Sequence, residues 1–177
     1  SSRMVRDDNY DKELSKIAIE KIENYQTIHT IVSGGLEYDD KVQIEVNAIP
    51  YYKVTDKKFN SIVAIKRFIN ENTAGDMNIS MHRTCDDKFI EEKGVLYERC
   101  ADRDVTTPDT SKGVIITNKT DNSFKAITIA PNNIPGSGHI GASFIAEDDT
   151  WKISDYEYDT YACNRSFDDF NNCASLR

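Results

Sequence analysis

The residues best suited to covalent chemistry in this chain are its four cysteines. They form two pairs that are close in sequence, Cys85 with Cys100 and Cys163 with Cys173. Such local pairs favour two disulfides, each of which would stabilise the fold by roughly 3 kcal/mol on the chain-entropy model. Disulfides in turn predict an oxidising, extracytoplasmic location.

The pairing of the cysteines is open, because four cysteines allow three connectivities. Local pairing is the simplest, since Cys85 and Cys100 can lie on neighbouring strands of a hairpin. Four buried free thiols are the alternative. A zinc site is disfavoured because neither pair has the short spacing of a structural zinc knuckle.

A glycine pattern at Gly136, Gly138 and Gly141 matches the dinucleotide-binding motif G-x-G-x-x-G. That motif requires a strand before it and a helix after it, so that the pyrophosphate meets a helix N-terminus. Here Pro135 precedes the motif and an apparent strand follows it. We therefore expect a loop and no cofactor.

Histidine and aspartate residues offer no convincing catalytic group. The three histidines are His29, His82 and His139. A triad of Ser137, His82 and an aspartate can be written down, but no spacing supports its geometry. We expect no enzymatic activity.

Paired acids recur along the chain and raise the question of calcium binding. None follows the spacing of a calcium loop, with its central glycine and terminal glutamate. Solvated turns and no bound metal are the expectation, although a glycosidase-like carboxylate pair stays open. The pairs are Asp39-Asp40, Asp86-Asp87, Asp148-Asp149 and Asp168-Asp169.

The size and charge of the chain narrow the possible partners. Its 177 residues, 38% hydrophobic and 29% charged, suit one soluble domain over residues 1–177. The net charge of -8 disfavours nucleic acid and anionic membranes. No stretch is apolar enough to span a membrane. The sequence reads as an excised domain, so we expect membrane contact only through a removed N-terminal segment.

Hydrophobic periodicity predicts one long helix at the start. Apolar residues between Asp8 and Thr30 recur at steps of three and four, and Ser33-Gly34-Gly35 ends the pattern. Residues 1–32 are therefore assigned to an N-terminal helix, with Leu14, Ile17, Ile22 and Tyr25 expected to pack on a sheet or a neighbouring subunit.

Residues 40–177 are expected to be mainly antiparallel β. Val42 to Ala48 alternates apolar and polar residues and is closed by Pro50. Phe59–Ile69 is favoured as a helix capped by Asp56, with a strand as the alternative. The further predicted strands are Met77–Thr84, Gly94–Cys100, Gly113–Thr117, Phe124–Ala130, Ile140–Ala146 and Trp151–Tyr158.

The fold class predicted is α+β, with the long amphipathic helix packed on an antiparallel sheet and a disulfide-bounded C-terminal loop. In the last strand, Trp151, Ile153 and Asp155 should share one face, with Lys152, Ser154 and Tyr156 on the other. Core packing is the first interpretation of these aromatics, and ligand or partner contact is the second.

This layout resembles that of type IV pilins and minor pilins. The resemblance covers the helix, the strands up to Tyr158, and the segment from Cys163 to Cys173. It implies assembly into a fibre through the helix, with the cysteine-bounded loop exposed for adhesion or subunit contact. The loop residues expected to bind a partner are Phe167, Asp168, Asp169 and Phe170. The defining leader and apolar first half of a pilin helix are absent here.

A second resemblance is to cone-shaped domains of the nuclear transport factor 2-like kind, which also start with helix and end in long antiparallel strands. Trp151-Lys152-Ile153 after an acidic turn is similar to the end of that fold, which implies a small-molecule or protein-binding module. A secreted effector or inhibitor is a third possibility. The leading expectation is a non-catalytic extracytoplasmic structural or adhesive subunit, whose partner is a protein or another copy of itself.

Overall fold

The protein has an α+β fold, seen in a computed structural model that describes residues 2–99, 110–111, 113–129 and 139–159. Its contacts divide the chain into two compact units. Unit 1 comprises residues 1–23 and 106–177, and unit 2 comprises residues 24–105. Whether the two units together form one domain over residues 1–177, as the sequence predicts, stays a prediction.

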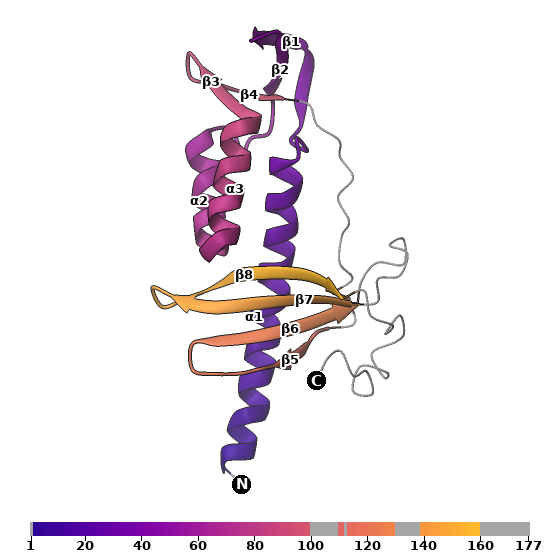
Figure 1. The fold of residues 1–177 in the computed structure, drawn as a ribbon, viewed down its shortest axis with the longest axis vertical. Helices are drawn as coiled ribbons and strands as arrows, with labels where there is room; N and C mark the ends of the chain where they lie inside the picture. Colours follow the sequence, from indigo (N-terminus) through magenta and orange to yellow (C-terminus); the bar gives the residue numbers. More distant parts are fainter. Residues whose placement is uncertain (1, 100–109, 112, 130–138, 160–177) are drawn as a thin grey trace. The chain divides into compact units, whose positions relative to one another are not determined.

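The first element is the predicted helix, α1, which spans Ser2–Val32 and contributes residues to both units (Figure 1). It ends where the sequence indicated. Gly34 has a φ of 82°, and the amide of Gly35 donates to the carbonyl of Thr30 at 2.9 Å. A Cβ on Gly35 would lie 2.5 Å from the Thr30 side chain, so only glycine fits there.

Unit 1 contains a four-stranded antiparallel sheet in which neighbours in sequence are neighbours in space, in the order β5-β6-β7-β8 (Figure 1). All four strands were predicted to within a few residues. Their bounds are β5 Ile115–Thr117, β6 Ser123–Ile129, β7 His139–Glu147 and β8 Thr150–Asp159.

The core of unit 1 lies between α1 and one face of this sheet. Three α1 side chains at steps of four are 0% exposed: Leu14, Ala18 and Ile22. On the sheet, Phe124 and Phe144 stack at 4.6 Å between ring centroids, and both are buried. Burying an apolar side chain of this size stabilises the fold by about 1.5–3 kcal/mol. Of the predicted helix contacts, Leu14 and Ile22 are fully buried, whereas Ile17 and Tyr25 are half-buried.

The face assignment predicted for β8 is wrong beyond Ile153, because the strand carries a β-bulge. Phe144 pairs with Ile153, but the next residue along β7, Ser143, pairs with Asp155, which leaves Ser154 as the extra residue. The alternation of faces therefore shifts by one residue. Tyr156, opposite Ala142, lies on the same face as Ile153.

Unit 2 has its own sheet in the order β1-β2-β4-β3, and two helices. Its core combines the C-terminal part of α1 with the two helices and one sheet face, and includes Ile28, Ile65, Ile69, Phe89 and Leu96. The elements are β1 Tyr38–Val46, β2 Ile49–Val54, α2 Ile62–Asn72, α3 Gly75–Lys88, β3 Phe89–Glu92 and β4 Val95–Arg99.

One prediction for this region is wrong, and one strand was not predicted. The segment Met77–Thr84 is not a strand but part of α3, so residues 40–88 are less β-rich than expected. The buried residues of α3, Met81 and Cys85, are four apart, as on one side of a helix. The strand β3, which forms a tight hairpin with β4 at Lys93 and Gly94, was missed.

The first strand of unit 2 also differs from its prediction. Val42 and Val46 are 39% and 38% exposed, so the apolar side of β1 is not buried in the core. Pro50 does not close the strand but lies in β2, opposite Glu45. Because β4 pairs only with Tyr51 to Lys53 of β2, a residue without an amide hydrogen is tolerated at position 50.

The predicted helix after Phe59 is confirmed, with a later start. Ser61 is its N-cap, and its hydroxyl accepts a hydrogen bond from the amide of Ala64 at 3.0 Å. Asp56, the predicted cap, instead accepts from the amides of Lys58 and Phe59 in the preceding turn. The carboxylate of Glu91 supplies a further acceptor, for the amide of Ile62 at 2.7 Å.

Candidate functional site

Cys85, the cysteine in the described part of the chain, has an environment that disfavours thiol reactivity. Cys85 is a free thiol, 0% exposed, on the buried side of α3. Burial raises its pKa to about 11, which disfavours the reactive thiolate. The predicted hairpin placement of Cys85 is wrong, because the residue lies in a helix.

The remaining predicted site residues lie outside the described residues. They are Cys100, Cys163 and Cys173, and the loop residues Phe167, Asp168, Asp169 and Phe170. The disulfide between Cys163 and Cys173 and the partner-binding role of the loop therefore stay predictions.

The glycine pattern does not sit in a nucleotide-binding context. Gly141 lies within β7, which continues as a strand to Glu147 with no helix after it. The other two glycines, and Ser137 of the hypothetical triad, are outside the described residues. An added Cβ at Gly141 would lie 3.2 Å from Cε of Lys125, so the glycine makes room for that lysine on the sheet.

His82 belongs to a group of polar side chains between α2 and α3. Its Nε2 lies 2.5 Å from Oδ1 of Asn70, which also accepts from Asn78 at 3.0 Å. Lys66 and Asp86 form an ion pair at 2.6 Å on the same two helices. The hydrogen bond that Lys66 donates to Asp86 raises the pKa of Lys66, and burial lowers the pKa of His82. These contacts tie the helices together.

The acidic pairs in the described residues serve turns and ion pairs. Asp39 accepts from the amide of Lys41 at 2.9 Å, and Asp87 pairs with Arg99 at 3.1 Å. Asp148 and Asp149 have φ values of 52° and 60° and form the β7–β8 turn. Within residues 2–99, 110–111, 113–129 and 139–159, no group of His, Cys, Asp and Glu could hold a metal ion.

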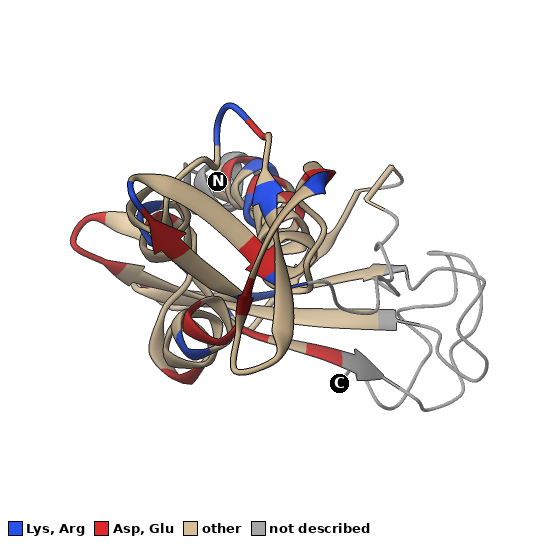
Figure 2. Ribbon diagram, turned by 90° about the horizontal axis from the view of Figure 1, so that it is seen from above, with Lys and Arg blue, Asp and Glu red and all other residues tan. Residues whose placement is uncertain are grey.

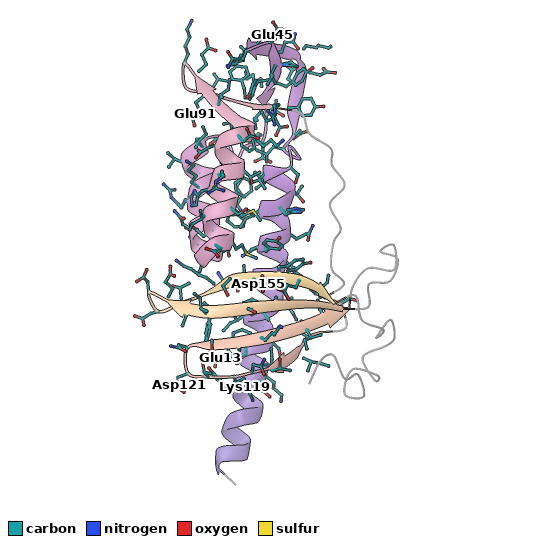
Figure 3. The ribbon with its side chains drawn as sticks, viewed as in Figure 1. Glu13, Glu45, Glu91, Lys119, Asp121 and Asp155 are labelled. Carbon is teal, nitrogen blue, oxygen red and sulfur yellow. The ribbon has the colours of Figure 1, made fainter. Side chains whose placement is uncertain are left out.

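One surface with potential for partner contact is α1 itself. The helix is fixed to unit 1 near both ends of its buried stripe, by Asp11 with Lys119 at 2.6 Å and by Glu23 with Thr110 at 3.3 Å. Lys119 lies in the turn between β5 and β6 (Figure 3). The backbone remains helical from Asp11 back to Ser2, past the edge of the sheet (Figure 1). No helix in the described residues is long and apolar enough to cross a membrane.

A second surface is the side of the unit 2 sheet that faces away from its core. Cross-strand pairs place Ile44 beside Tyr51, Val46 beside Ile49, and Ile90 beside Tyr97 on this side. We call these six residues the outer apolar face. All but Tyr51 are at least partly exposed. The sequence alone did not place Ile49 and Tyr97 on this face, because Pro50 interrupts the alternation and β3 was not predicted.

No protein-family model matches this chain, and a search of curated proteins finds no significant match. The geometry of the described residues is therefore the basis for function. It presents candidate contact surfaces on α1 and on the unit 2 sheet.

Proposed function

We propose that this protein is a non-catalytic, extracytoplasmic structural or adhesive subunit that assembles into a type IV pilus-like fibre through α1. The observation that carries the proposal is the helix of 31 residues, whose fully buried residues between Leu14 and Ile22 lie on one side. Leu14, Ala18 and Ile22 hold that side against an antiparallel sheet, and the opposite side is left for neighbours.

The arrangement of elements along the chain supports the proposal. A long helix comes first, two four-stranded antiparallel sheets and two further helices follow, and the pair Cys163 and Cys173 comes last. In this interpretation the loop from Asn164 to Asn172 is closed by a disulfide and presents Phe167 and Phe170 to a partner. The extracytoplasmic location rests on that disulfide.

Fibre formation requires that the contact between copies join two different surfaces. Such a heterologous contact does not close on itself and generates an open helical filament, whereas a self-complementary contact gives a dimer. The part of α1 that extends beyond the unit 1 sheet could supply one of the two surfaces. It differs from the part that packs on the sheet, so a contact between these two parts of neighbouring copies would be heterologous.

The test combines disulfide mapping with measurement of assembly. Protein purified without reductant is alkylated, and its intact mass is compared before and after reduction. We expect a Cys163–Cys173 link, together with open-ended growth in sedimentation velocity as concentration rises. Free thiols at both positions would contradict export, and a monomer at all concentrations would contradict the fibre.

The alternative is a protein-binding module of the nuclear transport factor 2-like kind, or a secreted effector or inhibitor. The outer apolar face of unit 2 favours a protein partner over a small molecule. In unit 1, the space where such a domain holds a ligand is occupied by Phe124, Phe144 and Leu14, all nearly or fully buried. Under this alternative, Val46→Lys abolishes partner binding and the control Val63→Lys, at a position 64% exposed on α2, does not.

A further inference from the structure

The strand β8 is a long edge strand whose outer side no described strand covers. The edges of the two described sheets are β5 and β8 in unit 1 and β1 and β3 in unit 2. Proteins usually protect such edges with short or irregular strands, because an open edge can pair with another chain. The other three edges follow that rule: β5 has 3 residues, β3 has 4, and β1 is irregular between Asp39 and Gln43.

The C-terminal part of β8 lacks this protection. The strand has 10 residues and a bulge at Ser154, but from Asp155 to Asp159 it pairs with β7 in unbroken register. Among the described strands, only β7 pairs with β8 (Figure 1). At about 3.3 Å per residue this regular part spans about 13 Å, which is long enough for an extended segment to pair along it.

Two carboxylates on this part of β8 define the charge of a partner. Asp155 and Glu157 lie two residues apart on the side of the sheet that faces away from α1, and both are exposed. Figure 2 shows red acidic residues along β8 towards the end of its described part. Neither carboxylate forms an ion pair with a described residue. The edge therefore presents negative charge at every second position.

The lysines on the same side of the sheet leave this charge in place. Lys152 is already paired with Glu147 at 3.2 Å. Lys125 lies over Gly141, opposite Glu157, without an ion pair to a described residue. A cation from another molecule would therefore meet carboxylates that no described lysine neutralises.

We propose that the edge of β8 from Asp155 to Asp159 binds an extended basic segment of another protein, which adds a fifth strand to the unit 1 sheet. Backbone hydrogen bonds hold the segment, and basic side chains at every second position lie beside Asp155 and Glu157. The positions between them lie on the side that faces α1, where Tyr156 is half-buried, so apolar side chains fit there. The partner segment therefore alternates basic and apolar residues.

Charge selects this partner over a second copy of the chain. Two β8 edges placed side by side would bring the carboxylates of both copies together, while Lys152 stays paired within each copy. The net charge of -8 adds to this repulsion. The inference is independent of the proposed fibre, because it requires no contact between copies.

The test uses the unaltered protein and a synthetic peptide of alternating lysine and valine residues. Binding is measured by fluorescence anisotropy of the labelled peptide at low salt, where exposed charges are weakly screened. The control peptide has the same sequence with methyl groups on its backbone nitrogens, so it keeps the charges but cannot pair as a strand. We expect the first peptide to bind and the second to bind much more weakly.

Hydrogen exchange of the β8 amides, followed by NMR, locates the contact. Every second amide from Asp155 to Asp159 points away from β7 and should exchange fast in the unbound protein. The lysine–valine peptide should slow the exchange of these amides. Slow exchange of all of them before the peptide is added would mean that the edge is already occupied, which would overturn the proposal.

Reversal of the two charges tests specificity. Asp155→Lys with Glu157→Lys should weaken binding of the lysine–valine peptide about tenfold and create binding of a glutamate–valine peptide. The new binding would show that the variant is folded. The matched control is Glu13→Lys with Asp121→Lys, which reverses two exposed acids on α1 and in the β5–β6 turn and should leave binding unchanged (Figure 3).

The remaining outcomes overturn the proposal. Equal binding of the methylated peptide would mean that charge alone attracts the peptide and that no strand is added. Binding that ignores the reversal of Asp155 and Glu157 would place the contact elsewhere on the protein. Absence of binding would remove this role from β8, and it would leave the proposed fibre untouched.

Discussion

Replacing Ile22 with alanine tests whether the buried side of α1 holds unit 1 together. Ile22 is 0% exposed and lies in the same stripe as Leu14 and Ala18. The substitution removes three carbons, which at about 0.8 kcal/mol each costs about 2.4 kcal/mol of transfer free energy. The cavity left against the sheet adds to this, so the total loss should be about 3–5 kcal/mol.

Trp151 provides a local signal for this measurement. It is the chain's one tryptophan, and its ring meets Phe124 edge-on at 4.9 Å within unit 1. Urea unfolding followed by its fluorescence therefore reports on the sheet that α1 covers. With a slope of about 2 kcal/mol per molar urea, a loss of 3 kcal/mol lowers the midpoint by about 1.5 M.

The matched control is the same chemical change at an exposed site. Ile79 on α3 is 56% exposed, and Ile79→Ala should alter stability by no more than about 0.5 kcal/mol. Equal effects of the two substitutions would refute the reasoning, because they would mean that the helix does not contribute a core to unit 1.

Three further predictions concern groups elsewhere in the described residues. Alkylation of Cys85 should be slow in the folded protein and fast in denaturant, because the thiol is buried and its pKa is raised to about 11; rapid labelling of folded protein would contradict this. Glu91→Ala should cost about 1 kcal/mol in urea unfolding because Ile62 loses its acceptor, and Glu91→Gln, which keeps an acceptor, should cost less. Stability should fall as pH drops below 6.5, since burial lowers the pKa of His29 and His82 and the unfolded chain then binds more protons. Urea midpoints of the double variant His29→Gln with His82→Gln should show a flatter pH dependence, and an unchanged slope would rule these histidines out.

The sheet of unit 1 could be predicted from sequence because each of its strands is bounded by residues that favour turns. Asp148 and Asp149 adopt positive φ values in a two-residue turn, as the acidic gap before Trp151 indicated. The helix α1 was predictable for a similar reason, since its apolar period runs unbroken to Gly34 and Gly35. In these segments the local sequence preference and the tertiary packing favour the same secondary structure.

The errors come from segments where packing overrides local preference. In α3, Asn78, Ser80 and Thr84 have low intrinsic helix propensity, so the local sequence does not favour the helix that forms. The helix forms because its buried residues Met81 and Cys85 complete a core with α2 and α1, which the sequence of α3 alone does not reveal. The bulge at Ser154 has the same character, since a shift of register depends on the partner strand.

The candidate surfaces were only partly predictable. The sequence indicated that α1 would have one buried and one solvent-exposed side, and the burial of Leu14 and Ile22 confirms the buried side. It could not indicate the outer apolar face, because that face exists only through the pairing of Ile44 with Tyr51 and of Ile90 with Tyr97. Residues far apart in sequence become one surface only when strands are in register.

The division of unit 1 between the two ends of the chain affects the order in which the protein can form. Unit 2 occupies one continuous stretch, so its parts are all present once Val105 has been synthesised. The apolar side of α1 at Leu14 and Ile22 must wait for strands that begin only at Ile115. Roughly a hundred residues separate this side of α1 from the first of these strands. At a synthesis rate of about 5–20 residues per second, the apolar side stays solvent-exposed for about 5–20 s. During that interval a nascent chain presents an amphipathic helix without its sheet, which is a substrate for a chaperone and a route by which two unfinished chains would join wrongly.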